Sequence, residues 1–96
     1  MAFQTEYEFI LPRGYLDQQG VLHREGTMRL ANAADEIISL RDPRVQQNPE
    51  YRTIFLLARV VTRLGTLSGV DTHVIENLFT ADLEFLQELY QRINTM

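Results

Sequence analysis

The strongest pattern in the chain is the run of residues 48–65, Asn48-Pro49-Glu50-Tyr51-Arg52-Thr53-Ile54-Phe55-Leu56-Leu57-Ala58-Arg59-Val60-Val61-Thr62-Arg63-Leu64-Gly65. An asparagine before a proline is typical of a helix start, because the amide side chain caps the helix and proline loses nothing at its first position. Apolar residues then recur at helical spacing around more than half of the circumference. We therefore expect one helix over Pro49–Leu64, ended by Gly65 as a C-cap and buried at the centre of the fold.

The polar side of this expected helix is a ridge of three arginines, Arg52, Arg59 and Arg63, and Leu56 falls within the ridge. Two interpretations of the ridge are open. Arginine beside an apolar residue is a composition enriched at protein interfaces, so these four residues are candidates for partner binding. Alternatively, the arginines are the solvated edge of a buried helix, and Leu56 is a core residue or an isolated exposed leucine.

Upstream of this helix, two runs alternate with the period of a β-strand. The odd positions of residues 3–11 are mostly apolar, which predicts a half-buried strand that Pro12 and Gly14 end. Residues 21–30 alternate again, after a turn-rich stretch that contains Gly20. Two such runs joined by a short loop predict an antiparallel hairpin.

Each remaining helix begins with a side chain that can cap it, or with such a residue before proline. The expected starts and ends are Asn32 to Leu40, a turn or so from Asp42-Pro43, Asp71 or Thr72 to Leu78, and Thr80 to about Ile93. The inward stripe of the last helix is Leu83, Leu86, Leu89, Tyr90 and Ile93. The expected fold class is α+β: one domain over residues 1–96, with an N-terminal antiparallel β-hairpin in residues 1–30 and three to four packed α-helices in residues 31–96.

Composition limits the classes of function. The chain has 96 residues and a formal net charge of −4; it lacks cysteine, and all nine basic residues are arginine. Without cysteine there are no disulfides and no thiolate metal sites. The acidic balance argues against nucleic acid as a partner, because phosphate binding needs a concentrated basic surface. No run approaches the roughly 18 apolar residues of a membrane span, and the N-terminus lacks a signal-peptide pattern, so we expect a cytoplasmic protein without membrane contact.

Catalytic and metal-binding constellations are not found in the sequence. His23 lies on the polar face of an expected strand and His73 at a helix start, and neither has a second histidine four residues away. We expect both side chains to be exposed and to have no functional role. Neither serine stands in a Gly-x-Ser-x-Gly elbow, and no phosphate-binding loop is present. Adjacent carboxylates such as Asp35 and Glu36 are explained by capping or solvation. We expect no enzyme, no cofactor and no metal.

Several further runs stand out in the sequence. They are Phe9-Ile10-Leu11-Pro12-Arg13-Gly14, Leu22-His23-Arg24-Glu25-Gly26 with Met28-Arg29-Leu30, Ala34-Asp35-Glu36-Ile37, Leu40-Arg41-Asp42-Pro43-Arg44-Val45, Leu57-Ala58-Arg59-Val60-Val61-Thr62-Arg63-Leu64-Gly65, and residues 75–94. Capping rules explain the stretches 11–14 and 24–30 least. Together the runs resemble the small tail assembly chaperones of contractile-tailed phages of the P2 and Mu type, a family with relatives in phage-like contractile injection clusters. The resemblance spans about Phe9 to Asn94.

The resemblance implies a non-enzymatic chaperone of tail morphogenesis, encoded in a phage or prophage. Such a protein binds the tape-measure protein, keeps it soluble and leaves before the particle is finished; the family brings no catalytic residues. In that family a longer frameshifted product often accompanies the short one. We expect binding by a helix-in-groove mode, with partner carboxylates meeting the arginine ridge.

Two other functions are kept as alternatives. One is a permanent small subunit of the baseplate or tube, joined to a neighbour through an open edge of the sheet. The other is an unrelated small regulator, such as an antitoxin-like binder. The oligomeric state is also open, because a two-stranded hairpin is marginal alone and is completed either by the helices or by a second copy of the chain.

Overall fold

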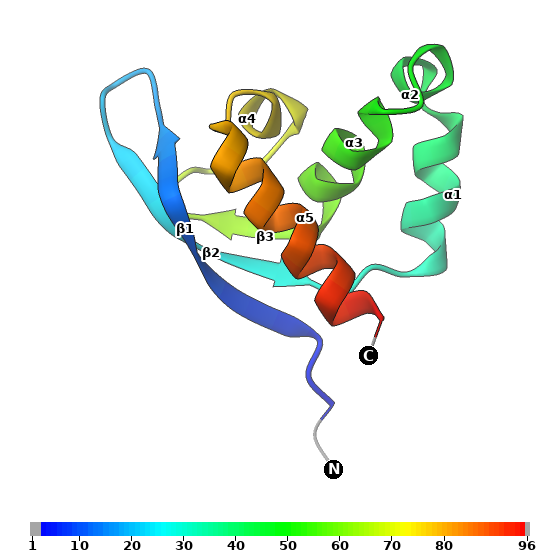
Figure 1. Ribbon diagram of the computed structural model, residues 1–96, viewed down its shortest axis with the longest axis horizontal. Coiled ribbons are helices and arrows are strands. Elements are labelled where there is room, and N and C mark those ends of the chain that lie inside the picture. Colours follow the sequence, from blue (N-terminus) through cyan, green and yellow to red (C-terminus); the bar gives the residue numbers. More distant parts are fainter. Residues whose placement is uncertain (1–2, 96) are drawn as a thin grey trace.

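Residues 3–95 are described by a computed structural model, in which a three-stranded antiparallel sheet packs against helices (Figure 1). The strand order is β1-β2-β3, so the N-terminal hairpin gains a third strand from the middle of the chain. The α+β class and the N-terminal hairpin are confirmed. In chain order the elements are β1 (Glu6–Leu16), β2 (Leu22–Arg29), α1 (Ala33–Arg41), α2 (Pro43–Gln47), α3 (Tyr51–Val60), β3 (Val61–Leu64), α4 (Thr72–Glu76) and α5 (Thr80–Asn94).

The central helix is shorter than the sequence pattern predicts. α3 ends at Val60, and the next four residues form β3, antiparallel to β2. Helix and strand periods both fit a short apolar run, and the adjacent β-branched residues Val60, Val61 and Thr62 favour the strand once β2 is there to pair with. Gly65 has the expected positive φ, 55°, but it ends β3 instead of capping a helix. The prediction of one helix to Leu64 was wrong.

Strand β1 runs through the two residues that were expected to end it. Pro12 and Gly14 lie in a bulge, where residues 11–14 of β1 oppose Arg24 alone on β2. Proline is tolerated at a bulge because its nitrogen does not have to donate a hydrogen bond to the neighbouring strand there. The guanidinium of Arg24 donates to the carbonyl oxygens of Leu11 (3.0 Å) and Pro12 (3.3 Å). The expected strand end was wrong, since these residues bend β1 and do not terminate it.

Asp82 holds the other side of the bulge. This side chain is fully buried in the first turn of α5, and its carboxylate accepts the backbone N–H groups of Arg13 (2.8 Å) and Gly14 (3.1 Å). Its negative charge also suits the positive end of the helix dipole. Thr80 does not cap α5 as predicted: the cap position is Phe79, which makes no side-chain cap bond. Asp82 is therefore the group that fastens the start of α5 to β1.

Three of the other capping predictions are confirmed, and the one for the central helix is wrong. The side chains of Asn32, Asp42 and Asp71 each accept a backbone N–H at the starts of α1, α2 and α4. Helix α3 begins at Tyr51 and not at Pro49, and its cap position is Glu50, which makes no side-chain cap bond, in place of Asn48. Helix α4 ends at Glu76, two residues before the expected Leu78. Within residues 3–95, local sequence therefore marks where three of the five helices begin.

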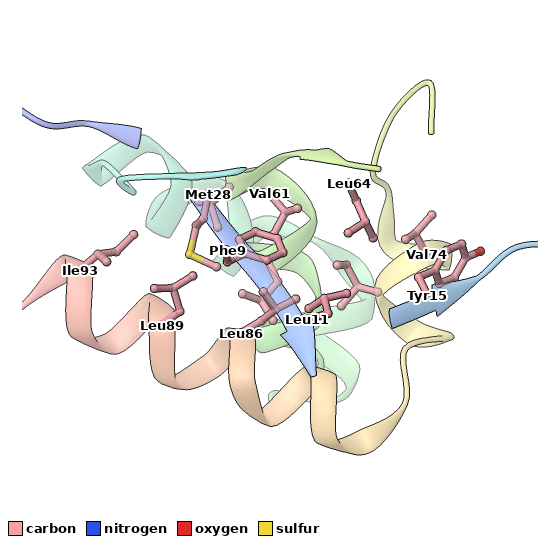
Figure 2. Packing of buried hydrophobic residues seen from close by; sticks show 13 residues of the cluster. Phe9, Leu11, Tyr15, Met28, Val61, Leu64, Val74, Leu86, Leu89 and Ile93 are labelled. Carbon is pink, nitrogen blue, oxygen red and sulfur yellow. The ribbon is translucent and has the colours of Figure 1, made fainter. Parts of the chain in front are cut away.

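The core lies between the sheet and helices α3 and α5. Leu86, Leu89 and Ile93 point from α5 toward Phe9 and Met28 of the sheet (Figure 2). The inward stripe predicted for the last helix is confirmed, its other two members being half-buried at the edge of the cluster. Burial of each large aliphatic side chain stabilises the fold by about 1.5–3 kcal/mol, so α5 is a main source of stability.

Gly26 of β2 is a position where only glycine fits. A Cβ there would overlap the ring of Phe9 and stand 2.6 Å from the carbonyl oxygen of Arg63 on β3. We expect Gly26→Ala to lower the free energy of unfolding by about 2–3 kcal/mol, because neither the strand nor the packed ring can move away freely. Denaturant titration measures this. Gly69→Ala is the matched control, since a Cβ at Gly69 meets nothing within 4 Å; equal losses in both variants would contradict the steric explanation.

Candidate partner-binding site

Asp35 is the centre of a buried ionic junction where β2, α1 and α3 meet. Its carboxylate, fully buried, accepts two hydrogen bonds from Arg29 (2.8 and 2.9 Å) and one from Nε of Arg59 (2.9 Å). The backbone N–H of Asn32 adds a fourth (2.8 Å). The bonds from Arg29 hold the pKa of Asp35 far below its ordinary value. Arg59, one of the four candidate residues, is thus bound to a side chain of its own chain.

Because of this junction, α1 buries polar side chains and exposes apolar ones. Asp35 and Ser39, one helical turn apart, are its buried residues, while Ile37, Ile38 and Leu40 are 50%, 39% and 57% exposed. Placing these aliphatic residues outward is unfavourable by itself, so the orientation is set by the ionic bonds on the other side. The spacing that predicted this helix was right, but it buries its polar side.

The exposed side of α1 is called the α1 surface here and comprises Ile37, Ile38, Leu40 and Arg41. Figure 1 shows α1 at the periphery of the molecule, where it packs on α3. Within residues 3–95, Arg41 takes part in no ion pair. A group of exposed aliphatic side chains beside a free guanidinium has the composition of a protein-binding surface.

A groove lined by Glu36, the residue before Ile37 in α1, contains two of the four candidate residues, Arg52 and Leu56. It is a cavity of about 450 Å³ between α1, α3 and α5. A second cavity of about 370 Å³ continues it toward the end of α5, since the two share Glu36, Tyr90 and Gln91. Leu56 is not exposed on a ridge, as one interpretation had it: it is buried, with 7% exposed, at the edge of the groove. We call these two cavities the α1–α5 groove.

Arg52 faces the groove in an ion pair with Glu36 of α1. Its Nε donates to Oγ of Ser39 (3.1 Å), and the hydroxyl of Tyr90 lies 3.3 Å from the other oxygen of Glu36. Both charged side chains stay accessible, Arg52 at 36% and Glu36 at 47%. In contrast to Asp35, this pair is open to water and to a ligand.

Arg63 is separated from the other three candidates, because it lies on β3 and not on the helix. It is exposed and lines a different cavity, of about 500 Å³, together with Glu8 and Glu25 of the sheet. Its Nε donates to Oγ1 of Thr27 at 3.4 Å. The ridge expected from a continuous helix therefore does not form: Arg52 and Leu56 lie at the groove, Arg59 in the junction and Arg63 on the sheet.

His23 is buried, contrary to its expected exposure, whereas His73 is exposed. The alternation of β2 is interrupted beside the bulge, where two successive residues are exposed, and this places the ring inside. Nδ1 of His23 accepts the N–H of Thr66 (3.2 Å), so the neutral ring carries its proton on Nε2, 2.8 Å from a carboxylate oxygen of Asp17. This bond lowers the pKa of Asp17. The ring fastens the hairpin loop to the segment after β3.

Among residues 3–95, no group of three histidine, aspartate or glutamate side chains is arranged to hold a metal ion. In the same part of the chain, no helix combines the length and the apolar character needed to cross a membrane. Comparisons with protein-family models, with curated proteins and with solved structures find no match to this chain. Function is therefore inferred from the site itself and from the resemblance.

Of the four residues predicted from the sequence, Arg52 and Leu56 lie together at the groove, and the α1 surface was not among the predictions. Ile37, Ile38 and Leu40 had the expected helical spacing, which does not tell which side of a helix is buried. A signal was present in the capping box, in which Asp35 turns back to the N–H of Asn32 and thereby points into the fold.

Proposed function

We propose that this chain is a non-enzymatic tail assembly chaperone of a contractile-tailed phage or phage-like particle. It acts in the cytoplasm of the bacterial host and binds the tape-measure protein during tail assembly. The resemblance over most of the chain supports this family. The observation that carries the binding role is the α1 surface, where a helix fixed by a buried ionic junction presents its aliphatic side chains outward.

A long helix with an apolar stripe is the kind of partner that suits this surface. Isolated exposed leucines are ordinary, but Ile37, Ile38 and Leu40 are grouped on one nine-residue helix. The helix cannot rotate to hide them without pulling Asp35 away from its two arginines. A partner helix that covers them removes apolar area from water, and Arg41 can pair with a carboxylate at its margin.

Truncating the α1 surface tests the proposal. We expect the double substitution Ile37→Ser and Ile38→Ser to reduce co-purification of the tape-measure protein roughly tenfold or more, because buried aliphatic contacts at an interface are each worth about 1 kcal/mol or more. The melting temperature of the free chain should change little, since both side chains are exposed. Ile10→Ser is the matched control: Ile10 is 58% exposed but lies on β1. Equal recovery of the tape-measure protein with the unaltered chain, the double variant and Ile10→Ser would contradict binding at α1.

The alternative of a permanent baseplate or tube subunit makes a different prediction. A chaperone leaves before the particle is complete, so mass spectrometry of purified mature particles should not detect this chain. Recovery of the chain in fixed stoichiometry with the tube or baseplate proteins would establish the structural role and refute the chaperone.

A further inference from the structure

We infer that Arg52 binds a carboxylate of the partner protein, and that Glu36 pairs with Arg52 until the carboxylate of the partner replaces it. This inference rests on the proposed function and adds the chemistry of one contact to it. The partner segment it describes is helical, with an acidic side chain beside apolar ones, and it enters the α1–α5 groove next to the α1 surface.

Two neighbouring carboxylates of α1 differ in their access to water. Asp35 is sealed from water and bound by four donors, so no ligand can replace it. Glu36 is about half exposed and has an arginine and a tyrosine hydroxyl as partners. An ion pair accessible to this degree contributes little net stability, about 0–1 kcal/mol, and an incoming carboxylate can exchange with it. Only one of the two acidic residues is therefore replaceable.

Arg52 is held in place by a buried side chain as well as by Glu36. Its Nε is held by Ser39, itself buried, so the guanidinium is positioned by the protein even when Glu36 leaves. It lines the groove together with Leu56, Leu57 and the ring of Tyr90. A fixed guanidinium beside apolar side chains fits a carboxylate on an apolar segment, because arginine binds carboxylates in a planar, bidentate way.

The length of the groove suits a short helical segment. The groove follows α5 from Gln87 to Asn94, about two helical turns or roughly 12 Å at 1.5 Å per residue. This matches a short part of a partner helix. Gln87 and Gln91 along its wall supply amide groups that donate and accept hydrogen bonds, which suits the polar margin of such a segment.

Opposite effects of Glu36→Gln and Arg52→Gln test the inference. The probe is the purified tape-measure protein of the same particle, and the measurement is its dissociation constant by isothermal titration calorimetry. We expect Glu36→Gln to tighten binding roughly fivefold, because it removes the competing carboxylate, and Arg52→Gln to weaken it roughly tenfold. The double variant should bind as weakly as Arg52→Gln alone.

Two controls separate this exchange from a change of net charge. Glu84→Gln and Arg92→Gln alter the charge by the same amounts at exposed positions of α5 outside the groove, and both should leave binding within about twofold. Circular dichroism melts show whether each variant is folded. If Glu36→Gln and Arg52→Gln weaken binding together, the pair is a structural link and the inference is wrong.

The failure of the inference is distinguishable from failure of the proposed function. If the unaltered chain binds the tape-measure protein and neither Glu36→Gln nor Arg52→Gln changes its affinity, the function stands and the groove contact is refuted. If the unaltered chain does not bind at all, both the function and the contact are refuted.

Discussion

Asp35→Asn is expected to lower the free energy of unfolding by about 3 kcal/mol and the melting temperature by about 15 °C. The substitution keeps the size of the side chain but removes the charge that two arginines and a backbone N–H bind. Removing one partner of a buried ionic cluster costs more than the cluster contributes, because the other charges lose their counterion. Thermal and guanidinium unfolding followed by circular dichroism measure the loss.

The neighbouring Glu36→Gln is the matched control for this effect. It removes the same charge from the next residue of the same helix, but from an accessible ion pair, so a loss below about 1 kcal/mol is expected. A similar loss in both variants would mean that helix α1 tolerates neither change for a reason other than burial, and the role given to the junction would be wrong.

The same junction predicts how stability depends on pH. The pKa of Asp35 is lowered in the folded state, so its contribution is complete above the unfolded pKa near 4 and is lost as the pH falls toward the folded value. The difference in stability between the unaltered chain and Asp35→Asn should be constant from pH 7 to about 5 and shrink below about 4. A difference that stays constant in acid would contradict the ionic explanation.

Asp82→Ala is expected to lower the free energy of unfolding by about 3–4 kcal/mol. It leaves the backbone N–H groups of Arg13 and Gly14 without their acceptor at a place that water does not reach easily, and each unsatisfied group costs about 1–3 kcal/mol. Hydrogen exchange gives a local measurement in addition to denaturation: these two amides should exchange much faster than in the unaltered chain. Glu84→Ala, an exposed acidic residue of the same helix, should change stability by less than about 0.5 kcal/mol. Unchanged protection of both amides would contradict the role given to Asp82 in holding the bulge.

Features governed by neighbouring residues could be predicted from the sequence. The hairpin, three of the helix starts and the inward stripe of α5 follow from alternation, capping and helical spacing within short windows. The α+β class follows from their order along the chain. These rules need no knowledge of what lies across the fold.

Features governed by distant residues could not be predicted. The helix does not continue through Val61–Leu64, because these residues pair with β2, more than 30 residues earlier. Asp35 is buried because Arg29 and Arg59, six and 24 residues away in the chain, bind its carboxylate. Asp82 meets a bulge 68 residues away. The candidate site was predicted wrongly for the same reason: α3 ends at Val60, so Arg63 lies on β3 and not beside the other arginines.

The inside-out arrangement of α1 has a consequence for the evolution of this protein. The residues that fix the position of the helix and those proposed to meet a partner are different side chains of the same nine residues. Under the proposed function, substitutions at Ile37, Ile38 or Leu40 would change which helix is recognised without changing the fold, whereas Asp35 cannot vary unless its two arginines change as well. A lineage that exchanges one partner for another would then adapt this chain by surface substitutions alone.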